Sequence, residues 1–273
     1  MSSQMQFRGA SAEALAALTD ELVAMTGSGE GADALADGLF TVSRTLRTEP
    51  ALRRFATDVS VPAEAKQGLV RQVLGGKVSD SAVDLVASAV ARRWTRSNDL
   101  PDAIEHLSEV ATVRSSAGDA GRLADELFSF GQLVQQNPEL RDALSDPARS
   151  TADKTALVDS LLSGKALPAT VTLAKQALAG TYRTVSVALT EYQKVAASVR
   201  DEGVATVRVA KPLTDAETSR LADALQRAYG RPIHLNMLVD PEVLGGIKVE
   251  IGDDVIDGTI ASRLDDARRM LAS

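Results

Sequence analysis

Two Gly-Lys pairs are the residues of this sequence that most resemble a phosphate-binding motif. A phosphate-binding loop needs a first glycine five residues before the Gly-Lys pair and a hydroxyl residue directly after it. Neither Gly76-Lys77 nor Gly164-Lys165 meets this requirement, because the four positions hold Arg71, Val78, Asp159 and Ala166. We therefore expect both glycines to end helices rather than to hold a nucleotide.

Three aspartates and two histidines are the remaining candidates for metal binding or catalysis. Asp253, Asp254 and Asp257 lie close together in sequence, but they lack the order of an EF-hand, and turn and cap preferences explain them. His106 and His234 are predicted to lie in different domains, so we expect packing or solvated roles for them. The sequence has no Gly-x-Ser-x-Gly elbow and no cysteine. It therefore predicts a protein that is not an enzyme and that has no metal or cofactor.

The composition favours helical cores and disfavours nucleic acid as a partner. Hydrophobic residues make up 44% of the 273 residues and aromatic residues only 3%, so the cores must be closely packed helices of Ala, Leu and Val. The net charge of −7 argues against nucleic acid, because phosphate binding needs clustered positive charge. We expect no membrane span, no secretory signal and, from the absence of cysteine, a reducing compartment.

A comparison of the sequence with itself shows a duplication at an offset of 88 residues. Between residues 35–91 and residues 123–179, 19 of 57 aligned positions are identical, including the pair Pro50 and Pro138. The offset is too long for a solenoid repeat, so it predicts a duplicated domain.

Each copy is predicted to be a helical bundle. Apolar residues at spacings of three and four predict a first helix over residues 12–25. Pro50 and Pro138 predict the start of a short third helix in each copy, with Asn137 as an N-cap. The sixth helix of the first copy, about residues 101–114, is expected to serve also as the first helix of the second.

From about residue 202, the apolar residues change to an alternating pattern. This pattern predicts strands at 206–209, 233–239 and 247–251. The segment Thr214–Glu217 predicts a capping box for a helix that ends at Gly230, and a last helix is predicted over 260–271. The order strand–helix–strand–strand–helix predicts a small α/β domain.

The stretch from Val239 to Gly258 carries the most specific signal. Gly245-Gly246 predicts a positive φ or a close backbone approach, and Asp257-Gly258 predicts an N-cap. The stretch resembles the C-terminal signature of the δ subunit of F-type ATP synthases, the oligomycin-sensitivity-conferring protein (OSCP) family. The signature positions are Asp240, Pro241, Leu244, Gly245, Gly246, Ile247, Asp257 and Gly258.

The resemblance covers nearly the whole chain, in a form with a duplicated N-terminal bundle as in actinobacteria. It implies a mainly α protein with two tandem helical bundles followed by a small α/β (βαββα) C-terminal domain. The expected domains are residues 1–114, 115–200 and 201–273.

The resemblance implies a stator subunit of the proton-translocating ATP synthase, part of the peripheral stalk that keeps the catalytic head from rotating with the central shaft. The implied partners are the N-terminal helix of an α subunit, the C-terminal region of the b subunit and other subunits of the head. The chain would lie at the cytoplasmic face of the bacterial cell membrane and associate with the membrane only through the complex. The alternative is a helical adaptor with an unrelated partner.

In this family, the α-subunit helix docks against the first and fifth helices of the bundle. Only the first bundle here has a first helix of its own, so we predict docking mainly on residues 11–26 and 79–94. The candidate side chains are Leu15, Leu18, Val83, Val86 and Val90. The same residues could instead form the bundle core, because helical periodicity does not separate core from docking face.

Overall fold

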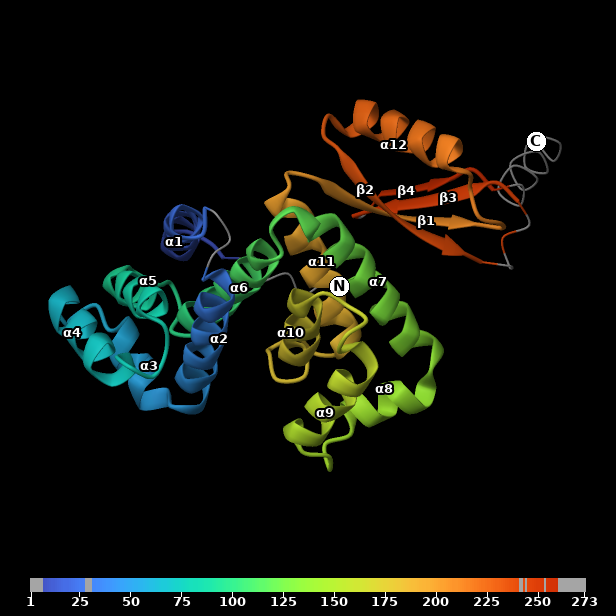
Figure 1. The fold of residues 1–273 in the computed structure, drawn as a ribbon. Coiled ribbons are helices and arrows are strands. Elements are labelled where there is room, and N and C mark those ends of the chain that lie inside the picture. Colours follow the sequence, from blue (N-terminus) through green and yellow to red (C-terminus); the bar gives the residue numbers. More distant parts are fainter. Residues whose placement is uncertain (1–6, 28–30, 241–242, 244, 253, 260–273) are drawn as a thin grey trace, which may run out of the picture. The chain divides into compact units, whose positions relative to one another are not determined.

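The chain forms a helical part followed by a small α/β part (Figure 1). The computed structural model describes residues 7–27, 31–240, 243, 245–252 and 254–259. Contacts divide the chain into two compact units, with the boundary between Tyr192 and Gln193 inside one helix. The predicted fold class, mainly α with a small α/β region at the C-terminus, is confirmed.

The helices repeat at the offset found in the sequence. The first bundle consists of α1 (Ala10–Met25), α2 (Ala32–Thr48), α3 (Pro50–Thr57), α4 (Ala63–Leu74), α5 (Asp80–Ala91) and α6 (Asp99–Ser115). A short 3-10 helix, η1 (Ala117–Asp119), leads into α7 (Ala120–Gln136), α8 (Pro138–Ser145), α9 (Thr151–Leu162), α10 (Pro168–Gln176) and α11 (Val185–Val199). Shifting the bounds of α2, α3 and α4 by 88 residues gives the bounds of α7, α8 and α9. The predicted duplication is therefore confirmed in the structure.

Proline and glycine residues set several helix ends. Pro50 and Pro138 begin α3 and α8 as predicted, because the fixed φ of proline suits the first helical turn. Asn137 precedes α8 but does not cap it, because its Nδ2 donates to a carbonyl oxygen of α7 at 2.8 Å. Gly76 and Gly164, with φ of 70° and 74°, lie just beyond α4 and α9. Both Gly-Lys pairs therefore lie where a helix ends, as expected.

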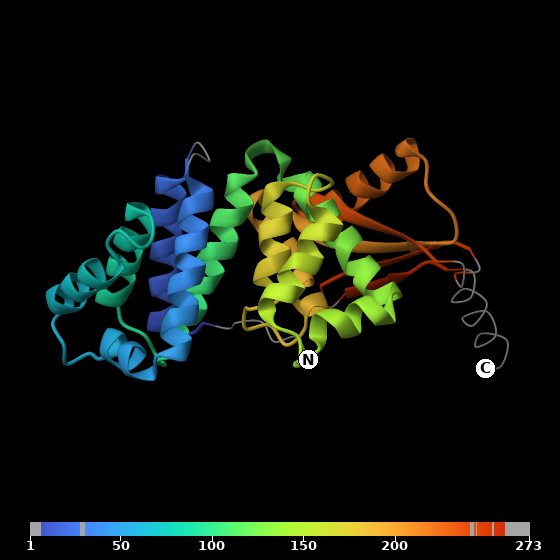
Figure 2. The same ribbon diagram turned by 60° about the horizontal axis from the view of Figure 1, so that its bottom comes forward.

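Helix α6 belongs to both bundles. It contacts α1, α2 and α5 of the first bundle and also α7 and α10 of the second. Its side chains are buried along almost its whole length, and Leu100, Ile104 and Leu107 are fully buried. Figure 2 shows this helix in green beside the blue α2. The prediction that one helix serves both bundles is confirmed by these contacts; hereafter the second bundle means α6–α11.

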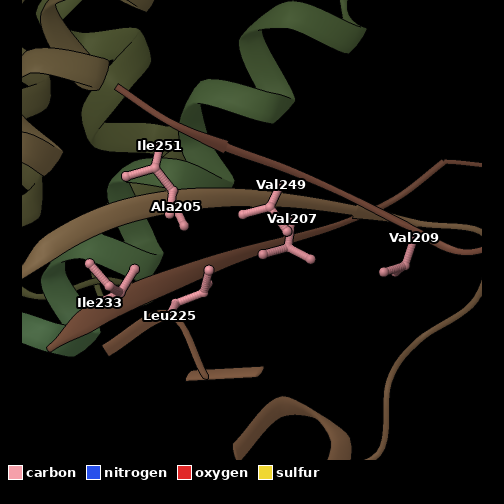
Figure 3. Close-up of a cluster of buried hydrophobic side chains, with 7 residues drawn as sticks. All are labelled: Ala205, Val207, Val209, Leu225, Ile233, Val249 and Ile251. Carbon is pink, nitrogen blue, oxygen red and sulfur yellow. The ribbon is translucent and has the colours of Figure 1, made fainter. Parts of the chain in front are cut away.

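The second unit contains a mixed sheet in the order β2-β1-β3-β4. Its strands are β1 (Gly203–Val209), β2 (Ile233–Val239), β3 (Ile247–Ile251) and β4 (Asp254–Asp257). Strands β1 and β2 are parallel, and the other two pairings are antiparallel. Helix α12 (Asp215–Tyr229) begins with the predicted capping box at Thr214 and ends at Gly230, whose φ is 70°. Its Leu225 packs with buried residues of β1, β2 and β3 (Figure 3).

Strand β4 is a fourth strand that the sequence pattern did not predict. All four of its residues are exposed, so no alternation of buried and exposed side chains marks it. Its terminal residues, Asp254 and Asp257, are typical of turns and caps rather than of strands. The predicted last helix, residues 260–271, lies outside the described residues.

Candidate functional site

Four of the five predicted docking side chains lie in the core of the first bundle. Leu18 is fully buried, and Val83, Val86 and Val90 are at most 6% exposed. Leu15 is half-buried. Because the buried side chains hold the bundle together, a helix that docks on α1 and α5 would have to contact other residues of the same two helices.

The outer face of α1 carries small and acidic side chains, and Val23 and Met25 in its last turn are exposed apolar ones. Glu13, Asp20 and Ala24 are exposed, and Ala17 is half-buried. Small side chains let another helix come close, because the distance between packed helix axes depends on the side chains at the contact. Asp84 on α5 is also exposed. This face can therefore accept a helix that carries basic side chains.

Polar side chains at both ends of α1 attach it to the rest of the first bundle. The buried Ser11 hydroxyl donates to Asp99 Oδ2 at 2.7 Å, at the start of α6. Near the other end, Glu21 Oε1 pairs with the Arg92 guanidinium and accepts a hydrogen bond from Ser88 Oγ at 3.1 Å. Helix α1 is thus held in register against both α5 and α6.

A partly buried ionic network joins the two bundles across α6. Arg47 of α2 forms an ion pair with Asp102 at 2.6 Å and a second one with Glu105. Glu105, only 2% exposed, also accepts hydrogen bonds from Thr181 N at 2.9 Å and Thr181 Oγ1 at 3.1 Å. The sequence pattern did not predict this network, because it brings together side chains 55, 58 and 76 residues apart in the chain.

Glu109 is a second buried carboxylate on α6. It pairs with His106 Nδ1 and accepts from the Tyr182 hydroxyl, each at 3.3 Å. Burial raises the pKa of the Glu109 carboxyl, and the bond to His106 opposes that rise. The half-buried His106 thus has a polar partner within its own helix. The signal that could have identified Glu109 is the repeat, which aligns it with Glu21.

The paired glycines of the C-terminal signature were predicted to have a positive φ or a close backbone approach, and the structure shows both. Gly245 and Gly246 have φ of 131° and 86°, so a positive φ is confirmed at both. A Cβ on Gly246 would lie 2.8 Å from Thr259 Cα, closer than real Cβ atoms approach other atoms. Asp257 Oδ1 accepts from Thr259 N at 2.9 Å, which is a local cap-like hydrogen bond.

The other described signature residues close the sheet. Asp240 N donates to Val209 O at 2.9 Å, and Gly258 N donates to Ile247 O at 2.9 Å. The first bond holds the end of β2 to β1, and the second holds the start of β3 to the segment that follows β4. The described signature residues therefore have a structural role, because their backbone hydrogen bonds join the ends of the strands in this domain. Two signature positions lie outside the described residues, Pro241 and Leu244.

Metal-binding clusters and membrane-spanning helices are absent from the described residues 7–27, 31–240, 243, 245–252 and 254–259. In those ranges, no group of three or more His, Cys, Asp or Glu side chains could hold a metal ion. None of the described helices combines the length and hydropathy of a membrane span.

Comparison with known proteins gives consistent matches. Residues 110–271 match the family model described as ATP synthase delta (OSCP) subunit. The chain is 58% identical over 266 residues to ATP synthase subunit delta of a Nocardioides species, covering 97% of both chains. It is 46% identical over 269 residues to the subunit of the same name from Streptomyces coelicolor, covering 97% of this chain and 98% of that one.

A solved structure, the mitochondrial ATP synthase hexamer of Toxoplasma gondii, contains a chain that matches 56% of this one and 97% of its own length, with 21% identity. Its TM-score is 0.32, so the assignment rests on the sequence matches. The alignments with both named relatives cover nearly the full length of each chain, and the family model covers more than half of this chain. The chain therefore belongs to the ATP synthase delta (OSCP) subunit family and is a structural, stator subunit of an F-type ATP synthase rather than an adaptor for an unrelated partner.

Proposed function

We propose that the first bundle holds the catalytic head by binding the N-terminal helix of an α subunit on the outer face of α1 and α5. The observation that carries the proposal is this outer face, where Ala17 and Ala24 leave room for a helix and Glu13, Asp20 and Asp84 supply negative charge. In this proposal the buried side chains of Leu18, Val83, Val86 and Val90 do not contact the partner helix. They hold α1 and α5 in position within the bundle core. Recognition of a helix by such a face needs small and apolar contacts at helical spacing.

The C-terminal domain is the proposed contact for the C-terminal region of the b subunit. Three exposed apolar side chains on its two edge strands support this assignment: Val239 on β2, and Val255 and Ile256 on β4, with exposures from 47% to 58%. Val255 and Ile256 are consecutive on β4, and this edge strand can offer both apolar side chains and unpaired backbone groups to another chain. The b subunit would thus attach at the opposite end of the sequence from the head contact.

The functional division is proposed to follow residues 1–114, 115–200 and 201–273. Because α6 packs in both bundles, the first two parts would act as one stiff body. In this scheme the chain transmits force and catalyses nothing. It would lie at the cytoplasmic face of the cell membrane and reach the membrane only through the complex.

Purification of the ATP synthase from native membranes tests this proposal. An affinity tag on the b subunit should recover this chain together with the α subunit and the other head subunits. From a strain that lacks this chain, the same tag should recover b with little or no head. Recovery of a complete head from the deletion strain would contradict the proposed attachment.

A further inference from the structure

The 88-residue register makes α6 and α10 the counterparts of α1 and α5. Helices α5 and α10 begin at equivalent positions, and α1 and α6 begin within one residue of equivalence. Glu21 of α1 and Glu109 of α6 are also equivalent. Each bonds toward its own fifth helix, Glu21 to Ser88 and Arg92, and Glu109 to Tyr182 just beyond α10. The second bundle therefore has its own version of the proposed docking face.

Helix α2 covers that face in the second bundle. The Ser108 hydroxyl donates to the Ala36 carbonyl of α2 at 2.9 Å and accepts from Gln176 Nε2 of α10 at 3.1 Å. One fully buried side chain of α6 thus touches both neighbours. Farther along, the Arg47 ion pair with Glu105 ties α2 to the residue that also binds the segment after α10. Both α2 and α10 contact α6.

Electrostatics agrees with the close approach of α2 and α10. Burial raises the pKa of the Asp37 carboxyl on α2, the neighbouring Asp33 adds to the rise, and the Lys175 ammonium of α10 opposes it. The Lys175 ammonium therefore lies within electrostatic range of the Asp37 carboxyl.

The difference between the two faces is visible in the exposure of equivalent side chains. On α1, Ala17 is half-buried, and Asp20 and Ala24 are exposed. Their counterparts on α6 are at most 2% exposed: Glu105, Ser108 and Thr112. These two helices have equivalent places relative to a fifth helix, so α2 accounts for the added burial.

We infer that α2 is the resident helix on the docking face of the second bundle, so that each chain offers a single site for a partner helix, on α1 and α5. Sharing α6 produces this result directly. The helix that packs on α6 as a member of the first bundle necessarily lies where a partner would dock on the second. The assignment of the partner as the α-subunit helix rests on the proposed function, whereas the covering of the second face by α2 does not.

Thiol labelling tests the covering of the second face without any partner. The chain has no cysteine, so single substitutions give a clean background. Asp20→Cys and Ser108→Cys occupy equivalent positions, and the second change is nearly isosteric. A maleimide should label Asp20→Cys rapidly. The labelling rate of Ser108→Cys should be lower by a factor on the order of 100 or more, because the buried thiol reacts only after local opening. The matched pair Ala24→Cys and Thr112→Cys should behave alike. Rapid labelling at positions 108 and 112 of the folded chain would overturn the inference.

Calorimetric titration of the full-length chain tests the number of sites. The probe is a synthetic peptide with the N-terminal helix sequence of the α subunit from the same organism. One peptide should bind per chain, and Ala24→Arg should weaken its binding at least tenfold, whereas Ala156→Arg, on an exposed face of α9, should not. Two peptides per chain, or undiminished binding to Ala24→Arg, would overturn the single-site inference. No binding to the wild-type chain would refute the proposed function instead, and the labelling result would still decide whether α2 covers the second face.

Discussion

The two bundles share the bounds of three helices, at an offset of 88 residues, but bring their second and fifth helices together by different means. In the first bundle, a glycine on α2 allows close contact. A Cβ on Gly38 would lie 2.7 Å from the Cβ of Ala82 on α5 and 3.2 Å from that of Val78. The start of α5 is then capped locally, because Ser79 Oγ accepts from Ala82 N at 3.3 Å.

In the second bundle, the residue equivalent to that glycine is Glu126. Its Oε2 accepts hydrogen bonds from Leu167 N at 2.8 Å and Thr170 Oγ1 at 2.6 Å. Leu167 stands at the N-cap position of α10, where its side chain cannot cap the helix. A carboxylate of α7 therefore holds the start of α10, through the Leu167 amide and the Thr170 hydroxyl, where a serine caps the start of α5. The second and fifth helices are thus held together by close packing in the first bundle and by a side chain distant in sequence in the second bundle.

Moving the second bundle's residue into the first should have the largest effect. Gly38→Glu forces a Cβ and a charge against α5, so we expect a loss of about 3 kcal/mol in the free energy of unfolding. Urea unfolding followed by circular dichroism measures the change. The control is Gly68→Glu on α4, where no atom lies within 4 Å of an added Cβ, and it should not destabilise the protein. Equal midpoints for the two variants would refute the close-contact explanation.

Removing each cap compares the two ways of starting the fifth helix. Glu126→Ala should cost about 1–2 kcal/mol, and Ser79→Ala about 1 kcal/mol or less. Although partial burial raises the pKa of Glu126, bonds from Thr170, Leu167 and Arg122 lower it below the usual value. The contribution of Glu126 is therefore present above the unfolded pKa and is lost as the pH falls through the folded one. A Glu126→Ala loss that is the same in acid and at neutral pH would contradict the carboxylate cap.

The buried carboxylate Glu109 should show the opposite pH dependence. Its folded pKa is raised, so the folded chain keeps a proton that the unfolded chain has released, and stability falls as the pH rises through this window. Glu109→Gln should therefore stabilise the protein at neutral pH, by an amount on the order of 1 kcal/mol, and flatten the pH profile. The groups facing this carboxylate are His106, Glu105 and Tyr182.

The equivalent change in the first bundle is the control for this prediction. Glu21 pairs with Arg92, so Glu21→Gln removes an ion pair and should give no stabilisation. Thermal unfolding of both variants between pH 5 and pH 8 measures the difference. If both substitutions shift the unfolding temperature in the same direction at neutral pH, the contrast between Glu21, which an arginine holds, and the buried Glu109 is wrong.

Local signals in the sequence predicted much of this fold. A single sequence shows the prolines at the starts of α3 and α8, the capping box at Thr214 and the positive φ at Gly245 and Gly246, because each acts within a few residues of its own position. The 88-residue duplication also needed no structure. Strand β4 was not predicted, because a short exposed strand leaves no pattern of buried side chains.

The candidate site was harder to predict than the fold. Periodicity selected Leu18 and Val86 because they are apolar at helical spacing, yet this is also the pattern of the core in which they lie. The outer face of α1 is marked by small and acidic residues, which in sequence look like any solvated helix face. Glu105 and Ser108 are buried only because α6 serves two bundles, and that depends on tertiary contacts far apart in sequence.

Restoring ATP synthesis in membranes that lack this chain tests the stator role of the first bundle most directly. Wild-type chain and Ala156→Arg should restore synthesis driven by a proton gradient to the same extent. Ala24→Arg places a long charged side chain on the outer face of α1. It should restore less than about a tenth of the wild-type rate, because it should weaken the affinity for the head at least tenfold, which is about 1.4 kcal/mol of binding free energy. Full restoration by a folded Ala24→Arg chain would contradict attachment of the head through this face.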